Sequence, residues 1–401
     1  MFSTLIANTV ITIIAPVYPL VAKSRGIGEV EIGLIFSIAP LFSFLCSFQI
    51  GNLIKAIGVK NVSTLGLAST VLNMLLLILA STQDNKGFII ISLIGRAVGG
   101  FGLASIYVSN MVVINRDYKS RAETFTSLME AFGGVGLMIS PIYCTLVYEE
   151  IGLTGVFFFL LIVILMFIPI NWYFISHELI TKSPASRTVD AKLILNSNLK
   201  LDLALLAYCY IVLCYLEPTV SLFFEGKGLT ESQIGLVFAA MASAYTLSNF
   251  FMAWIAAHTK IGSMSYLGPL VTVFVLTLTG PVSILFDSLW FSIVGVILTG
   301  VATAIGFSTI LPSMISETEK LGFNPASISN QLSSTYSMGM NLGEIVGPSI
   351  SGVLINGLGF SMSCGFLAAC GVALLITKFL VKTKDYSKLE LLNKELEMET
   401  F

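Results

Sequence analysis

The chain has 401 residues, of which 55% are hydrophobic and 11% charged, whereas an average soluble domain has roughly 25% charged residues. This composition excludes an ordinary soluble domain and indicates an integral membrane protein. The net charge of -2 says little about partners, and we expect the lipid bilayer, not nucleic acid, to surround the chain.

Twelve apolar windows follow one another along the chain, most of them long enough to cross a bilayer. They lie at about 3–22, 32–54, 61–81, 88–114, 123–147, 153–175, 201–224, 233–257, 264–286, 289–315, 327–355 and 360–381. Continuous apolar runs such as Val156 to Ile170 favour helices over the alternating strands of a barrel. The sequence therefore predicts an all-α membrane protein with twelve transmembrane helices.

The positive charges predict the orientation of these helices. If both termini are cytosolic, only four of the 21 Lys and Arg residues lie on the opposite side: Lys23, Arg25, Lys86 and Lys227. Arg96 is the one basic residue that we place deep in a span. Because cytosolic loops carry an excess of Lys and Arg, we expect cytosolic termini.

An internal repeat predicts two related halves. A shift of 202 residues aligns Ser24 to Phe36 with Gly226 to Phe238, with six identities in thirteen positions, and also pairs Pro16 with Pro218. A shift of 207 pairs three further residues: Gly136 with Gly343, Pro141 with Pro348 and Gly152 with Gly359. A parallel duplication of this kind is typical of two pseudo-symmetric six-helix bundles with a site between them.

The polar stretch between the halves predicts the domain boundaries. We expect an amino-terminal bundle at 1–175, a cytosolic linker at 176–200, a carboxy-terminal bundle at 201–383 and a cytosolic tail at 384–401.

Several motifs resemble those of the major facilitator superfamily. The loop Gly51 to Lys60, with Gly51 and Gly58, resembles that family's loop after helix 2, but Lys55 replaces its usual acid. The stretch Leu93 to Ala104 resembles the helix 4 motif, with a membrane Arg and small residues.

The helix 5 motif of the superfamily is matched twice. Gly136 to Pro141 resembles the antiporter motif, with Ser140 in place of a Gly, and the helix 11 copy is fuller. The resemblance implies gating or helix-packing roles for eight residues: Gly51, Gly58, Gly100, Gly136, Pro141, Gly343, Gly347 and Pro348.

Shorter matches resemble the vesicular amine transporters (solute carrier family 18), especially their polyamine branch. They are Leu216 to Phe223, Leu128 to Phe132 and Gly280 to Val282. This resemblance implies proton-coupled antiport of amines or polyamines, in the membrane of an acidic vesicle or in the plasma membrane.

Three acids lie well inside predicted spans: Glu130, Glu217 and Glu344. A charged residue at mid-bilayer costs roughly 2.5 to 3.5 kcal/mol on insertion scales, so each needs a protein-lined environment. Such an acid can hold a proton and release it when a cationic amine pairs with it. The alternative is a structural acid that hydrogen-bonds to a neighbouring helix or pairs with a loop cation such as Arg121.

Arg96 is a candidate partner of a membrane carboxylate, although long Arg side chains also reach the bilayer interface. Tyr215 and Tyr245 are candidates for cation-π contact with an organic cation. Most tyrosines in helices instead serve packing, and that alternative stays open for both.

The sequence carries no enzyme motif. It has two histidines and no phosphate-binding glycine loop with a Lys, and it predicts no metal site or cofactor. We therefore expect a gradient, most simply of protons, to supply the energy.

Together these observations predict a monomeric, proton-coupled antiporter of small organic cations that works by alternating access. Two alternatives stay open. One is a transport-inactive membrane protein that acts as a sensor or binding partner, which the departures at Lys55 and Ser140 favour. The other is a broader drug/proton antiporter.

Overall fold

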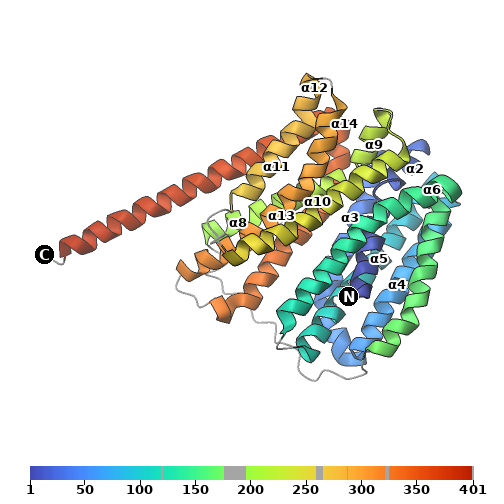
Figure 1. Ribbon diagram of the computed structural model, residues 1–401, viewed down its shortest axis with the longest axis horizontal. Helices are drawn as coiled ribbons and strands as arrows, with labels where there is room; N and C mark the ends of the chain where they lie inside the picture. The colour runs from blue at the N-terminus through green and yellow to red at the C-terminus, as the bar shows by residue number, and fades with distance from the viewer. Residues whose placement is uncertain (119–120, 176–195, 259–264, 287, 321–324, 400–401) are drawn as a thin grey trace.

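The computed structural model describes residues 1–118, 121–175, 196–258, 265–286, 288–320 and 325–399, and every regular element that they form is a helix (Figure 1). In chain order the helices are α1 (Phe2–Thr12), α2 (Tyr18–Ser24), α3 (Glu29–Ile57), α4 (Val59–Ser81), α5 (Asn85–Asp117), α6 (Ala122–Phe174), α8 (Ser197–Leu216), α9 (Val220–Gly226), α10 (Glu231–His258), α11 (Leu267–Thr277), η3 (Leu278–Val282), α12 (Ser283–Leu285), α13 (Leu289–Lys320) and α14 (Pro325–Glu399).

The described helices account for the twelve predicted spans. Eight of them are long and apolar enough to cross a membrane, and Phe2–Thr12 and Leu267–Val282 are shorter apolar helices. The two longest, α6 and α14, are each two spans joined at a glycine in the left-handed region, Gly152 (φ 78°) and Gly359 (φ 73°). The prediction of an all-α membrane protein is confirmed.

Two predicted spans are broken rather than continuous. The window 3–22 divides into α1 and α2, and the window 201–224 divides into α8 and α9. Each break contains a proline, Pro16 or Pro218. Proline has no N–H to donate and its ring clashes with the carbonyl four residues earlier, so the helix stops there. A hydropathy window does not detect this, because the apolar run continues through the break.

The chain reverses in the same way after each broken span. The seven-residue helices α2 and α9 are followed by Gly26 (φ 79°) and Gly228 (φ 88°), and the next long helices begin at Glu29 and Glu231. A positive φ is favourable for glycine and strained for other residues. The sequence repeat therefore reflects a repeated turn, and the predicted pseudo-symmetry of the two bundles is confirmed.

The bundles have two ends, which we name. The terminal face carries the start of α1, the end of α5 and the start of α8; the distal face carries α2, α9 and the turns at Gly152 and Gly359 (Figure 1). The long end of α14 extends away from the bundles as far as Glu399 (Figure 1). Most of the predicted linker, residues 176–195, lies outside the described residues, and the domain boundaries stay predictions.

Direct contacts join the two bundles towards the distal face. The Ser349 hydroxyl of α14 donates to the Ser37 hydroxyl of α3 at 2.8 Å, and Ser232 of α10 donates to Glu149 of α6. Helices α2 and α9 also touch. The bundles are therefore packed together at the distal face.

Glycines make this packing close. A Cβ on Gly33 would meet the Pro348 carbonyl, and a Cβ on Gly352 would meet the backbone of Glu29. Because these neighbours are backbone atoms, a larger residue at either position would force the bundles apart.

A buried ion pair corrects one sequence expectation. Lys378 of α14 is 4% exposed, pairs with Asp202 of α8 and donates to the Ser265 hydroxyl at 3.0 Å. Asp202 also accepts from the Ser313 hydroxyl of α13 at 3.1 Å. Arg96 is therefore not the one basic side chain buried within a span. All these partners belong to the carboxy-terminal bundle.

Candidate functional site

Glu217 lies in the break between α8 and α9 and is partly accessible to solvent. Pro218 removes one donor from the backbone there, and the Thr219 hydroxyl donates to the Tyr215 carbonyl, at the end of α8, at 2.8 Å. The break thus places a carboxylate between the end of α8 and the start of α9.

Arg96 of α5 lies across the bundle interface from Glu217. Arg96 is 2% exposed, and Glu217 and Tyr18 are the groups that interact with its charge. Among the described residues no acid lies within ion-pair distance of Arg96, and its Nε has no hydrogen-bond partner. A buried cation of one bundle therefore faces an acid of the other without a direct bond.

Glu344 of α14 is the second acid near Glu217, and the two carboxyl groups interact electrostatically. Two glycines bring α14 close to α8. A Cβ on Gly343 would meet Tyr210, and a Cβ on Gly347 would meet the carbonyl of Ile211 at 2.6 Å. This packing holds the Glu344 backbone beside α8, so its partly exposed side chain reaches the same interface.

Glu130 of α6 is solvent-exposed and lies on the other side of the interface. Its charge acts on Tyr107 of α5, on Tyr245 of α10 and on Tyr336 of α14. Glu344 acts on Tyr107 and Tyr245 as well. The two acids therefore share aromatic neighbours, and the structure brings Glu130, Glu344, Glu217 and Arg96 to one interface between the bundles.

An aromatic cluster in the carboxy-terminal bundle lies beside these acids, centred on Phe307 of α13. The Tyr210 ring stacks on Phe307 with centroids 4.5 Å apart, and the Tyr245 ring meets it edge-on at 5.9 Å. The Tyr336 hydroxyl donates to the Phe307 carbonyl at 3.1 Å. Aromatic faces next to carboxylates form an environment that attracts organic ammonium groups.

The two predicted aromatic residues lie in different places. Tyr245 belongs to the cluster beside the acids. Tyr215 is fully buried in the core of the carboxy-terminal bundle, and its hydroxyl lies near Ser363 and Cys364 of α14. The structure therefore does not bring Tyr215 to the acids.

A polar network lines the amino-terminal half of the interface. The Tyr107 hydroxyl donates to the Asn8 side-chain carbonyl at 2.7 Å. The Asn110 amide donates to the hydroxyls of Ser3 (3.0 Å) and Thr4 (2.9 Å). These bonds tie α1 to α5 and fix the Tyr107 ring next to Glu130.

Sequence reasoning missed Tyr107 and Phe307. The spacing held a signal for Tyr107: it lies eleven residues after Arg96, about three helical turns, so the two share one face of α5. Phe307 lies seven residues after Gly300, whose missing side chain allows α13 to approach Met241 and Tyr245 of α10. It therefore lies on the face of α13 that packs on α10.

The predicted gating glycines occupy helix contacts in several cases. Gly100 of α5 packs against Ala39 and Phe42 of α3, and Gly136 of α6 packs against the Leu5 carbonyl of α1. Gly58 has φ 85° and joins α3 to α4. At Gly51 an added Cβ would meet open space, so no close contact requires glycine there.

Both proline motifs lie at helix contacts, one within the amino-terminal bundle and one between the bundles. Pro141 is buried within α6, next to the contact between α6 and α1, and Pro348 of α14 lies against Gly33 of α3. Ser140 replaces the family's glycine, and its hydroxyl donates to the Thr9 carbonyl of α1 at 3.1 Å. This departure therefore adds a bond between the helices that the motif brings together. Lys55, the other departure, is exposed in the last turn of α3.

Among the described residues, no group of three or more His, Cys, Asp or Glu side chains is arranged to hold a metal ion. The acids of the interface are instead surrounded by tyrosines.

Comparison with known proteins gives a family and several relatives. The family model described as Major Facilitator Superfamily matches residues 1–328. The MFS-type transporter SLC18B1 of Mus musculus is 25% identical over 360 residues, covering 87% of this chain and 77% of that protein. SLC18B1 of Homo sapiens is 26% identical over 356 residues, with the same coverage.

Solved structures share the fold at low sequence identity. The nucleoside transporter NupG superposes with a TM-score of 0.71 at 12% identity, covering 94% of this chain and 97% of NupG. A D-xylose-proton symporter gives 0.70 at 11%, covering 94% of each chain. A bacterial homologue of the iron transporter ferroportin, in an inward-facing state, gives 0.67 at 14%, covering 96% of each chain.

Proposed function

Because the chain belongs to the major facilitator superfamily, a family of membrane transporters, we propose that it exchanges protons for organic cations, specifically amines or polyamines, by alternating access. The observation that carries this proposal is the set of three acids at the bundle interface, Glu130, Glu217 and Glu344, with Arg96 and the Phe307 aromatic cluster beside them. The similarity to SLC18B1, an MFS-type transporter, supports a transport function.

In the proposed cycle, Glu217 takes either a proton or the ammonium group of the substrate. An ionised carboxylate is costly to enclose in a low-dielectric interior unless a cation or a proton neutralises it. The bundles therefore change their arrangement around Glu217 only when the carboxylate holds a proton or a cation. Competition for one carboxylate makes the exchange obligatory, since the arrival of the cation requires the proton to leave.

Arg96 connects this competition to the other bundle. Its charge interacts with ionised Glu217 across the interface, and that interaction weakens when a proton or a cation takes the carboxylate. The relative free energy of the two bundle arrangements then depends on the occupancy of Glu217, as coupling requires.

The second and third acids suit a cation that carries more than one ammonium group. Glu130 and Glu344 share Tyr107 and Tyr245 as neighbours, so a ligand paired with one acid lies within reach of aromatic rings and of the other. A monoamine engages fewer of these groups. We therefore propose polyamines as the substrates. The alternative is a broader drug/proton antiporter, and transport assays with a panel of polyamines and cationic drugs distinguish the two.

The direction of transport follows from the predicted orientation. With the terminal face in the cytosol, the acid compartment lies at the distal face, as in the membrane of an acidic vesicle. The protein then moves cations from the cytosol into that compartment while protons leave it, and it acts as a monomer because each chain supplies both bundles.

The rival function is a transport-inactive sensor or binding partner. The exposed Lys55, in place of an acid of the gating loop, is the observation that favours it. Reconstitution distinguishes the two functions. In proteoliposomes with an imposed acid interior, the proposal predicts accumulation of labelled spermidine that collapses when a protonophore dissipates the gradient, whereas an inactive protein gives no accumulation above protein-free vesicles.

A further inference from the structure

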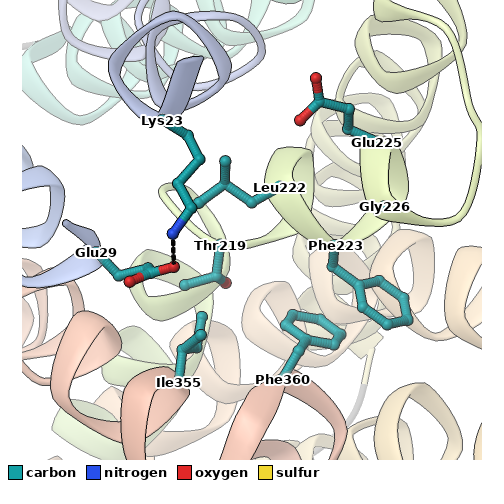
Figure 2. Close-up of a pocket in the computed structure, with 9 residues that line it drawn as sticks. All are labelled: Lys23, Glu29, Thr219, Leu222, Phe223, Glu225, Gly226, Ile355 and Phe360. Carbon is teal, nitrogen blue, oxygen red and sulfur yellow. Dashed lines mark hydrogen bonds and ion pairs between the residues drawn. The ribbon is translucent and has the colours of Figure 1, made fainter. Parts of the chain in front are cut away.

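A pocket of about 480 Å³ opens between the bundles at the distal face (Figure 2). Lys23 of α2 and Glu29 of α3 come from the amino-terminal bundle. The other lining residues come from the carboxy-terminal bundle: Thr219, Leu222, Phe223, Glu225, Gly226, Ile355 and Phe360. We call this the distal pocket. Its volume lies within the range of small-molecule sites, roughly 300 to 1,000 Å³.

The charges that line the distal pocket leave it net negative. Lys23 and Glu29 form an ion pair, drawn as a dashed line in Figure 2. Glu225 is exposed and makes no ion pair with any described residue. Lys227, the next cation along the chain, does not line the pocket. One carboxylate is therefore available to pair with a cation from solution.

The apolar part of the distal pocket suits the body of such a cation. The rings of Phe223 and Phe360 stack with centroids 4.1 Å apart and an interplanar angle of 20°, and Leu222 and Ile355 extend this apolar wall. In Figure 2 the two rings lie close together in the lower half of the view, and the Glu225 carboxylate lies at the top of the view. Aromatic faces attract ammonium groups, and apolar side chains favour a hydrocarbon body.

We propose that the distal pocket is a second binding site, specific for organic cations with an apolar body such as arylammonium ions, and that its occupancy holds the distal face closed. The pocket is distinct from the acids of the interface, because its nine lining residues include none of Glu130, Glu217 and Glu344. Only Thr219 lies close to them in sequence, two residues after Glu217.

A bound ligand holds the distal face closed because the walls of the pocket belong to different bundles. Lys23 and Glu29 belong to one bundle and the remaining lining residues to the other. When the distal face opens, these walls separate and a ligand in contact with both loses part of its contacts. A ligand that binds one arrangement better shifts the equilibrium towards it. A cation in the distal pocket therefore inhibits transport without competing for the site at the interface. This inhibition rests on the proposed transport function, whereas the binding does not.

Binding is tested on the purified protein with phenyltrimethylammonium, whose charge is permanent, from the shift in thermal unfolding temperature with probe concentration. The binding measurements use the Glu217→Gln background, which weakens binding at the interface, and the transport measurements keep the native Glu217. Glu225→Gln and Phe360→Leu are each expected to raise the Kd about two- to fivefold, and the pair about tenfold. The control is Glu150→Gln, an exposed acid near the distal turn at Gly152 that does not line the pocket; it should leave the Kd unchanged.

An unchanged Kd in the double variant would overturn the proposal. If Phe360→Leu fails to fold, Glu225→Gln decides alone, since Glu225 is exposed and its replacement is well tolerated.

In proteoliposomes, the probe applied to the distal face should lower Vmax at constant KM, and this effect should weaken in Glu225→Gln. Competitive inhibition that is insensitive to Glu225→Gln would assign the probe to the interface instead. Binding without any transport would refute the proposed function and leave the second site standing.

Discussion

Arg96 of α5 and Glu217 at the break of α8 interact across the bundle interface although no direct ion pair joins them. The two residues belong to different bundles, so their separation changes whenever the bundles rock. In the proposed cycle, this relationship links the protonation of an acid to the arrangement of the two bundles.

Removal of the Arg96 charge should uncouple the exchange. In Arg96→Gln, Glu217 keeps its carboxylate but loses the cation that opposes it across the interface. We expect proton-driven accumulation of amine to fall at least about tenfold, equivalent to about 1.4 kcal/mol of lost coupling, while exchange of labelled for unlabelled amine without a gradient continues. Arg121→Gln, an exposed change at the terminal face, is the control. Equal loss of both activities would indicate a folding defect rather than uncoupling.

The aromatic cluster should set affinity for ammonium groups. Phe307→Leu removes the ring that Tyr210 and Tyr245 contact. We expect the KM for amine uptake to rise about two- to fivefold, the range of an exposed cation-π contact. Tyr215→Phe is the matched control, because Tyr215 is buried away from the acids, and its KM should stay that of the wild type. A KM that rises in Tyr215→Phe but not in Phe307→Leu would reverse these assignments.

A disulfide across the distal face should arrest the cycle. The hydroxyls of Ser37 and Ser349 are 2.8 Å apart and belong to different bundles. Ser37→Cys with Ser349→Cys should crosslink under oxidation and stop uptake, and a reductant should restore it. Each single variant controls for oxidation of the six native cysteines. Full uptake by a crosslinked protein would mean that α3 and α14 do not separate at Ser37 and Ser349 during transport.

The predicted orientation has its own test. An epitope tag inserted into the predicted linker, residues 176–200, should be reachable by antibody only from the cytosolic side, because the Lys and Arg distribution places this linker with the termini. Detergent-permeabilised membranes give the total signal. Labelling from the distal side of intact membranes would exclude the twelve-helix topology with cytosolic termini.

The repeat and the spans were the parts of the fold that the sequence revealed. The pairs Gly26/Gly228 and Gly152/Gly359 were visible because a positive φ at the turns restricts both positions of each pair to glycine. The break at Pro218 was not predicted, since the apolar run continues across it. Hydrophobicity predicts which segments cross a membrane, but it does not predict where a helix breaks within such a segment.

The acids were predictable but their surroundings were not. Glu217 and Glu344 are costly residues in a bilayer, which identifies them without knowledge of their neighbours. Phe307 is one of 28 phenylalanines and becomes distinctive only once α13 packs on α10. The burial of Lys378 against Asp202 depends on four segments meeting near the terminal face. Such contacts arise from tertiary packing, which no local pattern encodes.

The exchange mechanism depends on Glu217, and one measurement tests this most directly. Glu217→Gln removes the group that binds both proton and cation, with nearly the same volume. Since an uncharged side chain is cheaper in the bilayer, the variant should reach the membrane at normal levels. Proton-driven amine uptake, normalised to protein, should collapse in Glu217→Gln and be intermediate in Glu217→Asp, which keeps the charge one methylene further back. A Glu217→Gln protein that accumulates amine at the wild-type rate would contradict the mechanism.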